Sequence, residues 1–177
     1  GRLYAATGVG TFYLRPRSEG SPAEFVRVDG VRNQCWWFAS VEDPEGTRGP
    51  QLLLAASAGL FRIDGDRATA IKAPTDAPFR TSLVYQSKVD PDRVWVGLFD
   101  GRASFRWQGG EWVDGVRVRG VTDQVRTLYE NPDGSLWAGT QATGLMRLRF
   151  EGLAKRQARP ETAVVERFGV AEGLQPG

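Results

Sequence analysis

Histidine is absent from the 177 residues, and cysteine occurs once, at Cys35. Without histidine the chain has no Ser-His-Asp triad, no histidine ligand for zinc and no histidine pH switch. A lone cysteine forms no internal disulfide, so cysteine usage does not identify a redox compartment. Apolar runs of roughly 18 residues, the length that spans a bilayer, are also missing. We therefore expect no membrane segment in this chain.

Dense clusters of basic residues are missing too. The 23 Lys and Arg residues are interspersed with 21 Asp and Glu residues, which leaves a formal net charge of +2. Nucleic-acid binding needs positive charge gathered on one face, so we expect no nucleic-acid partner. With 41% hydrophobic and 25% charged residues, the composition is that of a folded globular chain.

Residues 125–150 predict three short strands joined by two tight turns. Apolar and polar side chains alternate along 125–129, which is the period of a strand. The segment 131–134, Asn-Pro-Asp-Gly, has the residues of a tight turn. A second strand carries Trp137, and after Gly144 the alternation resumes up to Phe150. This order of strands and turns predicts an antiparallel meander.

Similar text recurs along the chain. Aligned on Tyr4, Leu54, Trp95 and Trp137, the copies are 54 − 4 = 50, 95 − 54 = 41 and 137 − 95 = 42 residues apart. A repeat of about 40–50 residues with about four strands is typical of a propeller blade. The sequence therefore predicts an all-β chain, a β-propeller of about four blades, each a four-stranded antiparallel meander, within a larger propeller.

The repeat divides the chain into one propeller segment, 1–177. We expect a partial blade at 1–28 without its first strand, blades at about 32–71, 81–118 and 122–168, and a connector at 169–177. Residues 35–38 (Cys-Trp-Trp-Phe) predict a buried inner strand, and 111–113 an outer strand. Residues 116–121 predict an exposed continuation or a linker, residues 72–79 a connector between blades, and residues 151–161 a loop.

Residues 125–140 and Gly144-Leu145 resemble the two-component-regulator propeller repeat, which reads roughly V-x-S-L-x-E-D-x-x-G-x-L-W-I-G-T-x-x-G-L. Residues 172–176 resemble the connector between blades of that family. The resemblance weakens towards the N-terminus, where Tyr4 and Leu54 replace the tryptophan. It implies the extracytoplasmic, periplasmic, seven-bladed sensor region of a bacterial receptor whose kinase, response-regulator or cyclase output module lies outside this chain. The repeat residues of the family are structural, so no catalytic residue is implied.

Loops that enter the inner strands of a propeller gather at one mouth of its central channel. Convergent polar groups there predict a ligand site. Arg80 and Arg126 would hold a carboxylate or sulfate in bidentate fashion. The competing interpretation is that these residues are solvated loop ends. The candidate ligand-binding residues are Asn33, Gln34, Arg80, Thr81, Ser82, Asp123, Gln124 and Arg126.

Other residues favour structure over chemistry. Tyr4, Trp95 and Trp137 recur at the same place of the repeat, which favours packing between blades over a sugar-stacking platform, and replacing Trp137 by Ala should cost about 3–5 kcal/mol. Asp residues in turns favour side-chain-to-backbone hydrogen bonds over Ca²⁺ binding. We expect no metal and no cofactor. Glu130 and Asp43 would act as a glycosidase pair only if the fold brought them together.

Three functions follow from this sequence. The first is a non-catalytic sensor segment that binds a small molecule or an oligosaccharide. The second is a scaffold for protein–protein interaction, and the third is a propeller-fold polysaccharide lyase or hydrolase. Unpaired strand edges and uncovered blade faces also predict either further blades or self-association to complete a ring.

Overall fold

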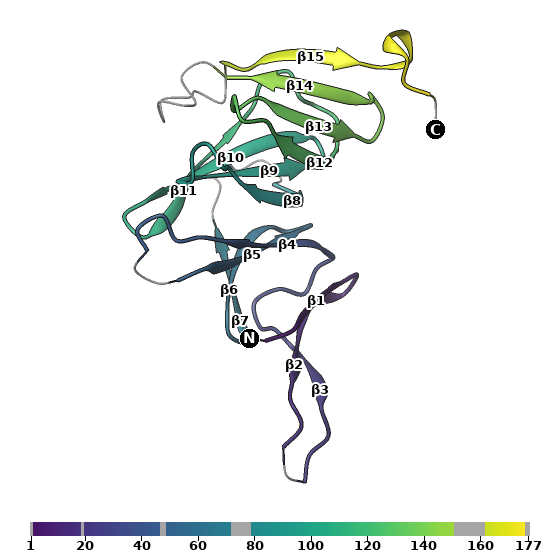
Figure 1. Cartoon of the computed structure of the whole chain (residues 1–177). Helices are drawn as coiled ribbons and strands as arrows, with labels where there is room; N and C mark the ends of the chain where they lie inside the picture. Colours follow the sequence, from purple (N-terminus) through teal and green to yellow (C-terminus); the bar gives the residue numbers. More distant parts are fainter. Residues whose placement is uncertain (1, 19, 47–48, 72–78, 151–161, 176–177) are drawn as a thin grey trace.

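The computed structural model describes residues 2–18, 20–46, 49–71, 79–150 and 162–175. These residues form antiparallel sheets that follow one another in chain order (Figure 1). Blade 1 consists of β1 (Tyr4–Thr7), β2 (Gly10–Arg15) and β3 (Glu24–Arg27). Blade 2 consists of β4 (Cys35–Val41), β5 (Gln51–Ala56), β6 (Gly59–Asp64) and β7 (Arg67–Ile71).

Blade 3 consists of β8 (Thr81–Gln86), β9 (Arg93–Leu98), β10 (Gly101–Gln108) and β11 (Glu111–Arg117). Blade 4 consists of β12 (Val125–Glu130), β13 (Leu136–Thr140), β14 (Leu145–Arg149) and β15 (Val164–Phe168). A short 3-10 helix, η3 (Val170–Glu172), follows β15. Each sheet pairs its strands in sequence order, and blade 1 has three strands where the others have four. The prediction of an all-β chain with propeller-like blades is confirmed.

A glycine opens the third strand of blades 2 and 3, lies just before the third strand of blade 4, and opens the second strand of the three-stranded blade 1. Gly10, Gly59 and Gly101 have φ values of +136°, +130° and +135°, a region that side chains avoid. A Cβ at Gly101 would collide with the carbonyl oxygen of Val121, which belongs to the connector towards blade 4. Position 101 therefore requires glycine, because the connector from blade 3 to blade 4 passes too close to the hairpin to leave room for a side chain.

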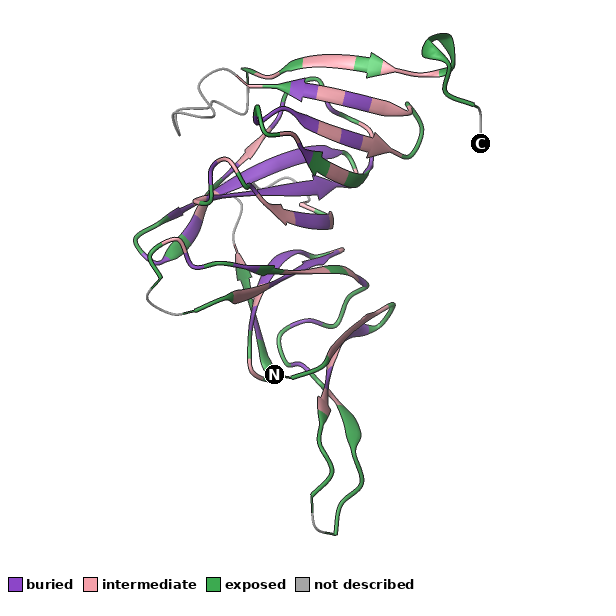
Figure 2. Ribbon diagram, viewed as in Figure 1, coloured by how far each residue is buried: buried purple, intermediate pink, exposed green. Residues whose placement is uncertain are grey.

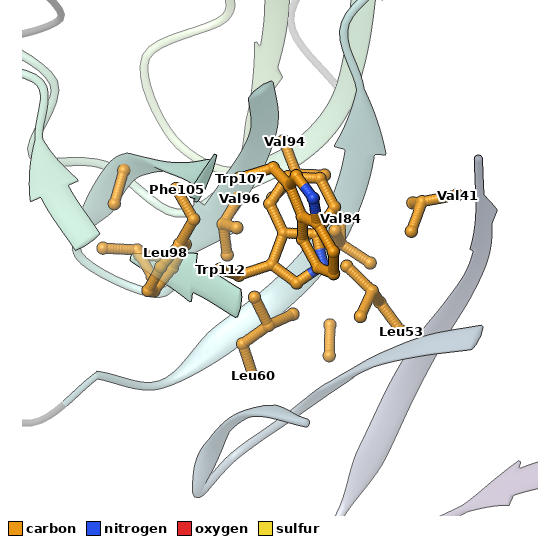
Figure 3. Packing of buried hydrophobic residues seen from close by; sticks show 12 residues of the cluster. Val41, Leu53, Leu60, Val84, Val94, Val96, Leu98, Phe105, Trp107 and Trp112 are labelled. Atoms are coloured by element: carbon orange, nitrogen blue, oxygen red, sulfur yellow. The ribbon is translucent and has the colours of Figure 1, made fainter. Parts of the chain in front are cut away.

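Apolar side chains between neighbouring sheets make the core. Leu53 and Leu60 of blade 2 pack with Val84, Val94 and Val96 of blade 3 in one buried cluster (Figure 3). Two further clusters hold the corresponding residues of blades 1 and 2 and of blades 3 and 4. Because each sheet buries its faces only against its neighbours, the blades stabilise one another.

The hairpin register corrects one position of the predicted repeat. Leu98 pairs with Gly101 and Ala56 with Gly59, so Trp95 and Leu53 both lie three residues before the pair. The equivalent of Trp95 in blade 2 is therefore Leu53, not Leu54. The sequence alignment slipped by one residue because residues 52–54 are all leucine. A shift of one residue moves a side chain to the other face of the sheet.

Two predictions of exposure were also wrong, as Figure 2 shows for the strands concerned. The run 35–38 is not buried throughout, because Trp37 is 54% exposed at the inner edge of blade 2. For residues 116–121 the expectation of exposure was wrong, whereas residues 118–121 do belong to the linker between β11 and β12. The strand β11 extends to Arg117, and Val118 and Val121 are buried between blades 3 and 4. The loop predicted at 151–161 and most of the connector predicted at 72–79 lie outside the described residues.

Candidate functional site

The entry loops of the inner strands occupy equivalent places in three blades. In each, a backbone carbonyl at the strand entry accepts a hydrogen bond from the neighbouring hairpin. The three pairs are Gln34 O with Ser57 N (2.8 Å), Arg80 O with Phe99 N (3.1 Å) and Gln124 O with Gln141 N (2.9 Å). The predicted candidates thus lie at the same end of successive inner strands, β4, β8 and β12.

Thr81 has a structural role in the fold. Its side chain is fully buried. The hydroxyl oxygen accepts the Ala56 N–H at 2.8 Å, and its proton lies between the carbonyls of Ala56 (2.9 Å) and Gly59 (2.7 Å). Ser82 likewise donates to the carbonyl of Val125 at 2.6 Å. These hydroxyls hydrogen-bond blade 3 to its two neighbours, and a ligand-binding role for them stays a prediction.

Asp123 is likewise used by the fold. Its Oδ2 accepts the backbone N–H groups of Ala142 (2.8 Å) and Thr143 (2.7 Å), which shapes the turn between β13 and β14. Partial burial raises the pKa of this carboxyl, but the hydrogen bonds from Ala142, Thr143 and Thr140 outweigh it and lower the pKa to about 2. The carboxylate is thus hydrogen-bonded within its own blade, and its assignment to a ligand stays a prediction.

The remaining candidates divide by exposure. Gln124 is buried, at 8% exposure, whereas Asn33, Gln34, Arg80 and Arg126 are exposed. Arg80 lies over the Phe99 ring, with Cζ 4.4 Å from the ring centroid, and Arg126 donates to Gln141 Oε1 at 2.8 Å. Both arginines keep donors that face solvent, so their role as an anion clamp stays a prediction.

A groove lies at the opposite ends of the inner strands, between blades 2 and 3. It has a cavity volume of about 560 Å³. We call it the inter-blade groove and define it by Trp37, Ala39, Glu42, Tyr85, Gln86 and Lys88. Sequence reasoning missed it. The only sequence signal for the groove was Trp37, the second tryptophan of the run 35–38, and the apolar pattern of that run predicts a buried strand instead.

Gln86 holds the two sides of the inter-blade groove together. Its Oε1 accepts the Glu42 N–H at 2.8 Å, and its Nε2 donates to the carbonyls of Glu42 (3.0 Å) and Pro91 (2.9 Å). Glu130 occupies the equivalent place on β12 and reaches back to blade 3, where it accepts hydrogen bonds from the Ser87 hydroxyl at 2.6 Å and the Lys88 N–H.

A second cavity of about 430 Å³ lies at the outer strands of blades 1 and 2. Three arginines and two aspartates line it together with Tyr13. Arg15 is paired with Glu24 at 2.6 Å, and Arg27 donates to the carbonyl of Val9 at 2.6 Å. Because two of its three cations are engaged by the protein, this cavity offers less free binding chemistry than the inter-blade groove.

Carboxylates considered for catalysis or metal binding serve the fold. Glu130 is bound to Ser87 and Lys88, and Asp43 Oδ1 accepts the Glu45 N–H at 3.1 Å, so each is held by its own surroundings. Asp133 shapes the hairpin before β13. Hydrogen bonds from Ser135, and to a lesser extent Arg147, lower its pKa. Across the described ranges, no three His, Cys, Asp or Glu residues gather as metal ligands would, and no helix is long and apolar enough to cross a membrane.

Arg102 is fully buried between blades 3 and 4. Its Cζ lies 4.6 Å from the Trp95 ring centroid and 5.3 Å from that of Phe150. Within the described part of the chain its three nitrogens have no hydrogen-bond acceptor. Desolvation lowers the pKa of Arg102 to about 9, and the charge of Glu130 opposes the shift.

No family model matches the chain, and no curated protein matches it. A solved structure does. The extracellular domain of BT4673, a proposed one-component system of B. thetaiotaomicron, superposes with a TM-score of 0.53 at 17% sequence identity. The likeness is one of fold. It covers 84% of this chain and 19% of the BT4673 domain, so this chain spans about a fifth of that length.

Proposed function

We propose that this chain is an extracytoplasmic sensor segment of a bacterial signalling receptor and that it binds a ligand without transforming it. The fold shared with the extracellular domain of a one-component system carries the proposal. The repeat text of residues 125–140, which resembles the two-component-regulator propeller repeat, points to the same class of receptor. A periplasmic location belongs to this proposal.

The proposed ligand contacts are the exposed members of the entry loops. Asn33, Gln34, Arg80 and Arg126 lie at equivalent ends of successive inner strands and are not consumed by the core. Two guanidinium groups suit a small acid or an acidic sugar, because each can bind a carboxylate or sulfate with two hydrogen bonds. Binding at this end would use the mouth of the propeller channel.

Thermal-shift screening of the chain against small acids and oligosaccharides tests the binding half of the proposal, because a ligand of the native state raises the unfolding midpoint. The double variant Arg80→Ala and Arg126→Ala should abolish the shift. Arg17→Ala, an exposed arginine in the turn between β2 and β3 and outside the entry loops, should keep it. Turnover of a polysaccharide by the chain would contradict the non-catalytic role.

Accessibility in the cell tests the signalling half. In the native host, protease added to cells with a permeabilised outer membrane should cleave the segment before the inner membrane is broken. Cleavage only after lysis would place the segment in the cytoplasm and rule out an extracytoplasmic sensor.

A scaffold role is the second candidate, and one observation favours it. The outer face of blade 4 carries Tyr129, which is 60% exposed, and the partly buried Trp137. Their equivalents in blade 3, Tyr85 and Trp95, are covered by blade 4. A face of this kind suits another blade, either of the same protein or of a second copy. Sedimentation as a monomer with no surface that binds apolar dyes would contradict this role.

A further inference from the structure

We propose that the inter-blade groove binds a small zwitterion that carries a flat ring, as an aromatic amino acid does. The proposal does not rest on the signalling role, because the groove and its chemistry belong to blades 2 and 3 alone. Its volume of about 560 Å³ lies within the range of small-molecule sites, which is roughly 300–1,000 Å³.

The apolar wall of the groove is aromatic. Trp37 is 54% exposed and lines the groove from β4. Ala39 of β4 and Val84 of β8 extend this wall as an apolar floor, whereas the Tyr85 side chain packs towards blade 4. An exposed indole beside a hollow offers a flat face on which a ring can stack, which is the geometry that aromatic pairs prefer.

The polar wall of the groove carries one charge of each sign. Glu42 follows the inner strand β4 and Lys88 lies just after the inner strand β8, and both are exposed. Among the described residues, neither side-chain charge has a hydrogen bond or an ion pair, and the hydrogen bonds of both residues are made by their backbone groups. A ligand with an ammonium and a carboxylate group would satisfy both charges at once, whereas a neutral sugar would satisfy neither.

The strand ends that carry these charges are held in place. Gln86 ties the backbone of Glu42 to that of Pro91, and Glu130 ties the backbone of Lys88 to blade 4. Both strand ends are thus fixed before a ligand arrives. Little ordering of the backbone is then needed on binding, which favours affinity for a small ligand.

Calorimetric titration of the chain with L-phenylalanine tests the proposal. We expect saturable binding with one site. Two matched compounds separate the contributions of ring and charge: L-leucine keeps both charges without the ring, and N-acetyl-L-phenylalanine amide keeps the ring without the charges. Each should bind at least about fivefold more weakly, because each lacks one set of contacts.

Variants locate the site. Trp37→Ala should weaken L-phenylalanine binding about tenfold, whereas Tyr129→Ala, an equally exposed aromatic outside the groove, should leave it unchanged. Glu42→Lys and Lys88→Glu should each weaken it about fivefold. The double variant with both changes should recover binding, since a zwitterion can dock in the reversed sense. All these side chains are exposed, so the variants should fold as the parent does.

Several outcomes would overturn the proposal. These are the absence of saturable binding by L-phenylalanine, equal binding of the uncharged amide, or binding that survives Trp37→Ala. Saturable binding of a neutral disaccharide in place of the amino acid would refute the ligand class. None of these results bears on the cellular location or on the arginines of the entry loops, so the two proposals fail separately.

Discussion

The Gln86 side chain of blade 3 makes two hydrogen bonds to the backbone of Glu42 in blade 2: it accepts the Glu42 N–H at 2.8 Å and donates to the Glu42 carbonyl at 3.0 Å. The two residues are 44 positions apart, about one repeat. Glu130 makes the corresponding contact between blade 4 and blade 3 through Ser87 and Lys88. The blades pack mainly through apolar faces, which are not directional. The polar contacts are directional, so they fix the position of one blade relative to the next.

Replacing Gln86 by Ala should therefore destabilise the chain by about 1–3 kcal/mol, because the freed backbone groups of Glu42 lose their partners. Urea denaturation measures the loss. Gln108→Ala, at an exposed position on β10, serves as the control and should change stability little. Equal stability of the two variants would show that the hydrogen bonds between Gln86 and Glu42 do not stabilise the fold.

Trp95 and Trp137 occupy the same place of the repeat but not the same environment. Trp95 is fully buried and stacks on Phe150 at 4.8 Å, whereas Trp137 is only partly buried on the outer face of blade 4. Trp95→Ala should cost about 3–5 kcal/mol. Trp137→Ala should destabilise the chain clearly less than Trp95→Ala, because less of its side chain is buried. The loss of about 3–5 kcal/mol that the sequence predicts for Trp137 therefore applies to Trp95. Denaturation midpoints of both variants decide the order.

Arg102 should be replaceable by Leu with a gain in stability. The positions that follow the hairpin glycine in blades 2 and 4 are Leu60 and Leu145. A buried guanidinium without an acceptor carries a desolvation penalty, and apolar replacements of buried charges often stabilise by about 1–4 kcal/mol. A raised unfolding temperature for Arg102→Leu would bear this out. A lowered one would show that the stacking on Trp95 outweighs the burial of the charge.

Asp123 should make stability depend on acid pH. Its pKa is about 2 in the folded state, below the ordinary value of about 3.9 in the unfolded chain. Between these values the unfolded state binds more protons. The stabilisation by Asp123 is therefore complete above about pH 4 and is lost as the pH falls towards 2. Unfolding midpoints measured across this range should show a weaker pH dependence for Asp123→Asn than for the parent.

Much of the fold could be predicted from local pattern. The alternation along residues 125–150, the Asn-Pro-Asp-Gly turn and the spacing of Trp95 and Trp137 placed most strands of blades 3 and 4 within a few residues. The alignment failed at Leu53, where three consecutive leucines give no sign of which one faces blade 3. Register there depends on the pairing of Ala56 with Gly59, which the apolar text does not specify.

The candidate site was less predictable. Thr81 and Asp123 have the same polar character as Arg80 and Arg126, yet the first two are bound by backbone groups of hairpins 19 to 25 residues away. Side chains that look free in sequence are recruited wherever a buried or turning backbone leaves a donor or acceptor unsatisfied. Trp37 shows the opposite case, an apolar residue left exposed where the groove between blades 2 and 3 opens.

By itself the sequence determined an all-β chain of repeated meanders, because period-two alternation and turn residues act over a few neighbouring positions. Only the tertiary structure decided which polar side chains remain free, which aromatic residues are covered and where a groove opens. Those properties depend on how one blade face meets the next, and the contacts that set this join residues about a repeat apart.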